Sequence, residues 1–284
     1  MTVRMASFIR TFGLFATLIL TSSAFAQEGG GEDFISSLNW TFGPTTVSIP
    51  GGAKFDIPEG YAFLDATETG KFQEYIQNIP TPNETLFAPE SLSWFAVFQF
   101  EQTGYVKDNE EIDADAILEG VREGQRQGNK ELESRGWPTL TIDGWAYSPY
   151  YDPSTKRLEW AITATSHPTG EKVVNFNTRI LGRRGVMKVT LVTEPNTLQT
   201  DVPHFKTALA GYDFLPEEQY AAFREGDKVA AYGLGALILG GAAAAGAKSG
   251  LLKSAGKFIL FGILALFAGL WSRIKGLFGS KKAE

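Results

Sequence analysis

The strongest constraint on this chain is an apolar tail near its C-terminus. No charged residue occurs from Val229 to Ala247 or from Phe258 to Trp271, and lysines lie between the two blocks. The first block is long enough to span a bilayer but is mostly Ala and Gly. As a helix, the second covers only about 21 Å of a hydrocarbon core of about 30 Å. We therefore predict that residues 228–284 form a membrane anchor of one or two helices, held by the lipid bilayer.

The N-terminus has the pattern of an export signal. Arg4 and Arg10 precede or flank an apolar run, and Ala24-Phe25-Ala26 has the small residues of a cleavage site. We predict a signal peptide over residues 1–26 and an exported domain over residues 27–227. The chain has no cysteine, which is compatible with a bacterial periplasm. The expected location is the inner membrane of a Gram-negative envelope, with the main domain in the periplasm.

The acidic and basic residues are distributed unequally between the predicted exported domain and the predicted anchor. Nearly all acidic side chains lie in residues 27–227, whereas residues 228–284 carry many lysines and one acidic residue, Glu284. An acidic domain is repelled by nucleic acid, and a basic tail is attracted to anionic headgroups. We therefore expect no nucleic-acid partner. Keeping an exported domain soluble is an equally simple reason for its acidity.

The periodicity of residues 27–227 predicts an α+β fold built on an antiparallel sheet. Residues 94–100 are apolar on both faces of a strand, which favours the middle of a covered sheet. Apolar and polar residues then alternate in three runs joined by short turns, which predicts a late three-strand meander. Helices packed on the sheet complete the fold. Expected strands lie at 46–49, 53–57, 157–165, 174–180 and 187–191, and expected helices at 66–79 and 113–135, the second capped by Asp113.

Several short motifs, taken in order, resemble a catalogued prokaryotic family. They are PEGY at 58–61, GWP at 136–138, LEWA at 158–161, LGRRG at 181–185 and DKVAAYG at 227–233. The chain resembles the membrane-anchored proteins called domain of unknown function 2167, from about Leu38 to Trp271. The resemblance implies membrane anchoring and no established activity, so it transfers no site residue. The order of elements is also loosely similar to the PsbP-like α/β/α sandwich.

Two groups of residues are candidates for contact with a partner. Arg183-Arg184 lies between two glycines at a hairpin tip, where guanidinium groups are able to bind phosphate or carboxylate. A solvated turn without structural partners is the simpler interpretation. An aromatic loop after Gly136 is either a recognition surface or core packing. The candidate contact residues are Arg183, Arg184, Trp137, Trp145 and Tyr151.

The sequence predicts no catalytic residue, metal site or cofactor. There are only two histidines, and neither a nucleophile elbow nor a zinc motif is present. The acidic run 108–115 lacks calcium-loop spacing and fits the start of a helix better. We expect a membrane-anchored envelope protein that acts through protein or lipid contacts, with an envelope protein as a possible partner. The alternative is an envelope hydrolase that uses carboxylates in a cleft, and an enzyme is the less favoured of the two.

Overall fold

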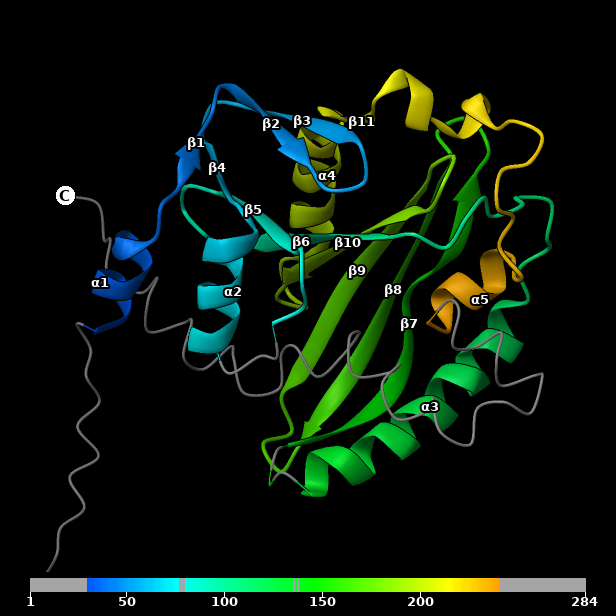
Figure 1. Ribbon diagram of the computed structural model, residues 1–284. Helices are drawn as coiled ribbons and strands as arrows, with labels where there is room; N and C mark the ends of the chain where they lie inside the picture. Colours follow the sequence, from blue (N-terminus) through cyan, green and yellow to red (C-terminus); the bar gives the residue numbers. More distant parts are fainter. Residues whose placement is uncertain (1–29, 77–79, 135, 137, 241–284) are drawn as a thin grey trace, which may run out of the picture.

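The computed structural model describes residues 30–76, 80–134, 136 and 138–240 (Figure 1). Its strands are β1 (Thr41–Phe42), β2 (Thr45–Ile49), β3 (Ala53–Ile57), β4 (Tyr61–Leu64), β5 (Thr85–Pro89), β6 (Phe95–Glu101), β7 (Thr139–Asp152), β8 (Arg157–His167), β9 (Lys172–Leu181), β10 (Val186–Thr193) and β11 (Tyr212–Phe214). Its helices are α1 (Gly30–Ser37), α2 (Ala66–Tyr75), α3 (Ala114–Ser134), α4 (Leu198–Leu209) and α5 (Leu234–Ile238), with 3-10 turns η1 (Pro216–Glu218) and η2 (Tyr220–Ala222).

An eight-stranded antiparallel sheet organises the domain, in the order β1-β4-β5-β6-β10-β9-β8-β7. A second sheet of three strands, β11-β3-β2, packs with α4 on one face, and α2, α3 and α5 lie over the other (Figure 1). The predicted α+β class with a large antiparallel sheet and packed helices is confirmed. The predicted anchor beyond residue 240 lies outside the described residues, as does the predicted signal peptide.

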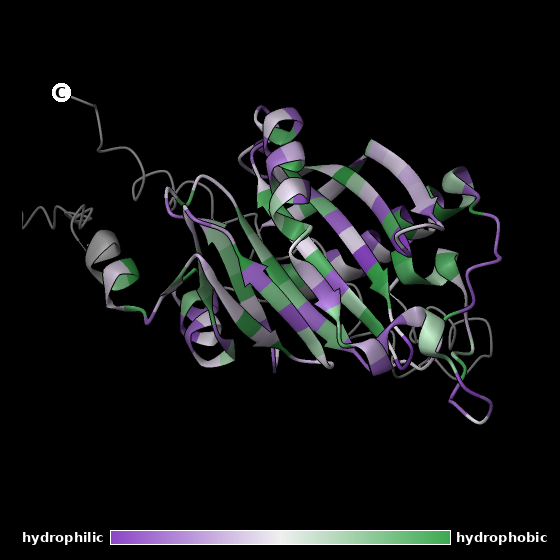
Figure 2. Cartoon of the chain, turned by 90° about the horizontal axis from the view of Figure 1, so that it is seen from above, coloured by the Kyte–Doolittle hydropathy of each residue, from purple (hydrophilic) through white to green (hydrophobic). Residues whose placement is uncertain are grey.

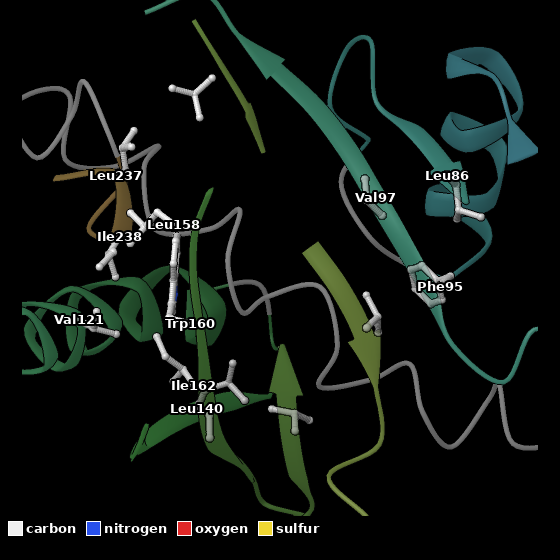
Figure 3. Close-up of a cluster of buried hydrophobic side chains, with 14 of the residues drawn as sticks. Leu86, Phe95, Val97, Val121, Leu140, Leu158, Trp160, Ile162, Leu237 and Ile238 are labelled. Carbon is white, nitrogen blue, oxygen red and sulfur yellow. The ribbon is translucent and has the colours of Figure 1, made fainter. Parts of the chain in front are cut away.

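Alternation along the strands produces two cores, one on each face of the large sheet. Successive strand residues point to opposite faces, so Trp160 and Ala161 of β8 enter different cores. Hydrophobic and hydrophilic positions alternate visibly along the strands (Figure 2). The first core lies under α2, α3 and α5 (Figure 3). The second lies under α4 and the small sheet, around Phe55, Phe176 and Phe205.

Most predicted elements lie where the local pattern placed them. The meander is β8-β9-β10, with Arg157 paired to Ile180 and Val186 paired to Leu181. The strand predicted at 94–100 is β6, which lies between β5 and β10 in the sheet. The helix predicted at 113–135 is α3, and the Asp113 carboxylate accepts a hydrogen bond from the Ala116 N–H at 3.0 Å. That bond confirms Asp113 as the N-cap.

The first residues of the expected anchor belong to this domain. Leu234, Leu237 and Ile238 of α5 are buried in the first core beside α3 (Figure 3). Val229 bridges to Tyr105, and Gly120 lies against the end of Leu239. In the part of the chain that the structure describes, no helix combines the length and apolarity needed to cross a bilayer. The rest of the predicted anchor, residues 241–284, lies outside the described residues.

Candidate functional site

Both arginines of the Arg183-Arg184 turn form ion pairs with carboxylates elsewhere in the domain. Arg183 donates from Nε and Nη2 to the Asp227 carboxylate at 2.7 and 2.8 Å, and its side chain is 14% exposed. Arg184 pairs with Glu218 of η1, although its side chain is 57% exposed. The expectation that both arginines project from the tip without structural partners is wrong. The reason is that residues 216–228 return across this turn and supply carboxylates with matched geometry.

Asp108 is the centre of a second polar cluster at the same end of the sheet. Its Oδ2 accepts hydrogen bonds from the Tyr151 hydroxyl at 2.7 Å and from the Lys156 ammonium at 2.8 Å. Partial burial opposes ionisation of Asp108, but the bonds from Lys156, Tyr151 and Tyr220 outweigh it and lower its pKa. Burial is the main cause of a raised pKa of Tyr151, and the hydrogen bond to Asp108 and the charge of Asp108 raise this pKa further. The cluster is a closed network in which the carboxylate stays ionised and the phenol stays neutral.

The aromatic residues after Gly136 form a strand, and the prediction of a loop there is wrong. β7 is the last strand of the sheet, and its pairing with β8 is interrupted by bulges near Gly144, Trp145 and Tyr147. These bulges, with Pro149, hide the strand's alternation from a reading of the sequence. Trp137 lies outside the described residues.

The other candidates on β7 have different environments. Trp145 packs against the first core, and its Nε1 donates to the Ala114 carbonyl at 3.2 Å. Tyr151 also packs on that core. Tyr147 and Tyr150, in contrast, are 42% and 60% exposed. The structure therefore joins Tyr151 to Asp108, places Trp145 beside the start of α3, and leaves Tyr150 the most exposed of these side chains.

A serine and a histidine that are neighbours in the sequence do not form a catalytic pair in the structure. Ser166 and His167 are consecutive on β8, so their side chains point to opposite faces; His167 Nε2 lies 3.0 Å from Thr141 Oγ1. Among the described residues, no group of His, Asp or Glu side chains is arranged to hold a metal ion. Of the described carboxyl groups with a resolved shift, Glu84 alone has a raised pKa, caused by burial. The carboxylate pair that a hydrolase needs is therefore not seen there.

The acidic run 108–115 is divided among three structural roles. Asp108 holds Tyr151 and Lys156, Asp113 caps α3, and Glu110 accepts a hydrogen bond from the Gly235 N–H at 3.0 Å. These carboxylates bind protein donors on different elements, so they do not form one ligand set for calcium.

A polar strip on the middle strands was missed by the sequence reasoning. Arg179 of β9 is 3% exposed, stands opposite Lys188 of β10, and lies 4.7 Å from the Trp160 ring centroid. Burial lowers the pKa of Arg179 to about 10, with the charge of Glu101 opposing it. The sequence carries a signal for this strip, because the polar residues Asn175, Asn177 and Arg179 occupy every second position of β9. Polar positions that alternate along a strand usually mark a solvent face, whereas both faces of β9 are buried.

Comparison with known proteins gives a matching family and similar solved structures. The family described as "Protein of unknown function (DUF2167)" matches residues 41–271. No curated protein matches the chain. The solution structure of cyanobacterial PsbP (CyanoP) from Synechocystis sp. PCC 6803 is similar over 60% of this chain and 92% of that chain, with 10% sequence identity and a TM-score of 0.37.

Proposed function

This chain belongs to the DUF2167 family, whose members are described as proteins of unknown function, and we propose that it is a membrane-anchored envelope protein that acts through contacts and not through catalysis. In this proposal residues 1–26 direct export, residues 241–284 hold the chain at the inner membrane, and the α+β domain lies in the periplasm. The apolar block 258–271 and the lysines around it support the anchor.

The observation that carries the proposal is the aromatic edge of the large sheet. β7 pairs with β8 on one side only within the described residues. On this strand Tyr150 is 60% exposed, whereas Tyr147 is partly exposed and packs edge-on against Phe176 of β9. Exposed aromatic side chains anchored on a rigid strand are typical of protein contact surfaces. An edge strand also has backbone groups able to pair with a strand of a partner. We therefore propose another envelope protein as the occupant of this edge.

The paired charges nearby support a contact role over a hydrolase. Arg183, Asp108 and Lys156 each have an opposite charge as partner, and the Asp108 and Asp227 carboxyls have lowered pKa values. A general acid needs a carboxyl group whose pKa is raised toward neutrality. Glu84, the carboxyl with a raised pKa, hydrogen-bonds Gln73 of α2, away from these residues.

The proposal is tested by placing a photo-crosslinking amino acid at Tyr150 of the full chain in cells. We expect a discrete crosslinked protein that is identified by mass spectrometry. Phe42 of β1, at the opposite edge of the same sheet, is also exposed and serves as the matched control position. Equal crosslinking from both positions, or none from Tyr150, would contradict the proposed surface. A cytoplasm-only reporter fused after Ala221 should be silent, and activity there would contradict the topology.

A further inference from the structure

Two positively charged side chains are direct neighbours on the middle strands of the large sheet. Arg179 of β9 is paired with Lys188 of β10, and residues directly opposite each other in an antiparallel pair have Cβ atoms about 4.5–5.5 Å apart on one face. Arg179 also pairs with Leu158 of β8, which belongs to the first core and identifies the face. Like charges in this arrangement repel each other. The pair therefore needs a compensating negative charge.

Arg179 has fewer hydrogen-bond acceptors around it than its guanidinium has donors. The residue is 3% exposed, and the hydrogen bond of its side chain within the described residues runs from Nη1 to the Thr178 carbonyl at 3.2 Å. A guanidinium has five N–H donors, and a buried donor without an acceptor is costly. Most of the Arg179 donors therefore have no acceptor in the part of the chain that the structure describes.

The indole ring next to Arg179 has an unused donor as well. The guanidinium carbon lies 4.7 Å from the centroid of the Trp160 ring, which is fully buried in the first core. This cation–π contact holds the guanidinium against the ring. Nε1 of the same ring is buried and has no hydrogen-bond partner among the described residues. The unused donors of Arg179 and Trp160 are therefore neighbours.

The nearby acids do not neutralise the two cations. Glu101 of β6 lies 3.7 Å from the Lys188 ammonium, which is an ion-pair distance but too long for a hydrogen bond. The charge of Glu101 also opposes the effect of burial on Arg179. Glu84 acts on Lys188 too, but it is hydrogen-bonded to Gln73 of α2, and burial raises its pKa. The two cations thus share one close carboxylate, which leaves an excess of positive charge.

One end of this cluster is accessible to solvent. The side chains of Lys188 and Glu101 are each 32% exposed. On this face α2 packs on β4 and β5, and α3 packs on β7, so β6 and β10 lie between the two helices (Figure 1). The accessible end is therefore at Lys188 and Glu101, and the buried end is at Arg179 and Trp160.

We propose that Arg179 and Lys188, together with the Trp160 N–H, bind the carboxylate group of a small, singly charged ligand. The planar guanidinium is able to donate two parallel N–H bonds to a carboxylate, and the ammonium adds a donor from the neighbouring strand. A single negative charge matches the excess positive charge, whereas Glu101 repels a doubly charged ligand more strongly. This site lies away from the β7 surface and goes beyond the contact function proposed above.

The first test measures the thermal unfolding midpoint of the full chain in neutral detergent at neutral pH. Sodium acetate, sodium phosphate and sodium chloride are compared at equal ionic strength. A ligand that binds only the folded state raises the midpoint in a saturable way. We expect acetate to raise the midpoint relative to chloride, and to do so more than phosphate. Equal effects of acetate and chloride, or a larger effect of phosphate, would contradict the proposal.

Two variants of the cations assign the acetate effect to this site. Lys188→Gln removes the partly exposed charge, so the protein should fold and its apparent affinity for acetate should fall several-fold. Arg179→Met should abolish the acetate effect. Lys172→Gln, at an exposed lysine that pairs with Asp143, is the matched control and should keep the wild-type response. A response that Lys188→Gln and Arg179→Met both retain would place acetate elsewhere and overturn the proposal.

Glu101→Gln gives a result that a structural role of the cations alone does not predict. The change removes the shared carboxylate and keeps the size of the side chain, so the excess positive charge increases. Acetate should then bind several-fold more tightly, and the effect of phosphate should increase more than that of acetate. Unchanged or weaker responses to both anions in Glu101→Gln would show that the charge balance is not that of an anion site, and the proposal would fail.

Discussion

At the scale of single residues, the best-defined electrostatic feature is the pair of Arg183 and Asp227. The two residues are 44 positions apart, and the Asp227 carboxylate receives two guanidinium N–H bonds and the Arg224 backbone N–H at 2.8 Å. These bonds lower the pKa of Asp227 from 3.8 to about 2. Because the pKa is lower in the folded than in the unfolded chain, the pair stabilises the fold above a pH of about 4. That contribution is lost as the pH falls toward about 2.

The Asp227→Asn variant tests this pair. At neutral pH it should have a lower free energy of unfolding than the wild type, because Arg183 loses its ionised partner. Between pH values of about 4 and 2, however, it should lose less stability than the wild type. Urea unfolding at several pH values measures both effects. Glu171→Gln, an exposed carboxylate change, should keep the wild-type acid response. An unchanged acid response in Asp227→Asn would show that the pair does not contribute.

At the scale of elements, α5 is the last helix among the described residues, and it is part of the first core. It is short, yet three of its side chains are buried in the first core, and the Glu110 carboxylate binds the Gly235 N–H near its start. Burial of these side chains, and not helix propensity, supplies the stability of so short a helix. Carboxylates of the acidic run before α3 thus accept hydrogen bonds from backbone N–H groups of both α3 and α5.

Leu237→Ala is the corresponding element-scale variant. Leu237 is buried, so the change removes buried methyl groups and leaves a cavity, and the free energy of unfolding should fall by about 2–5 kcal/mol. Chemical denaturation measures the loss. Leu215→Ala, at an exposed leucine, should cost about 0.5 kcal/mol or less. Similar small losses in both variants would show that α5 is not part of the core.

At the scale of the whole molecule, one sheet is covered on both faces and the chain continues beyond it. The two cores share the middle strands, since neighbouring residues of β8, β9 and β10 contribute to different cores. The domain therefore needs every strand of the meander together with the helices on each face.

Two truncations test this division of the chain. A chain ending at Gly240 keeps α5 and loses 241–284, so it should be folded and soluble. A chain ending at Asp227 loses Leu234, Leu237 and Ile238, so it should be unfolded or strongly destabilised. Fractionation with a carbonate wash and circular dichroism measure the two properties. A chain ending at Gly240 that stays in the washed membrane would place the anchor elsewhere.

Local sequence patterns predict the features of the fold that depend on residues close together in the chain. Alternation identified the meander, apolarity on both faces identified the central strand β6, and Asp113 marked the start of α3. Each of these signals reflects hydrogen bonding or side-chain direction within a few residues, so one stretch of chain is sufficient. The bulges and Pro149 of β7 interrupt that local signal, and the strand was therefore missed.

Contacts between residues far apart in the chain depend on the folded arrangement of the elements. The sequence predicts Arg183 to be without a partner because its partner, Asp227, is 44 positions away in the chain. The apolar residues 229–240 were ambiguous for a further reason. A protein core and a bilayer both exclude water and select the same side chains, so hydropathy cannot distinguish them. In the structure, Leu234, Leu237 and Ile238 of this stretch are buried in the first core.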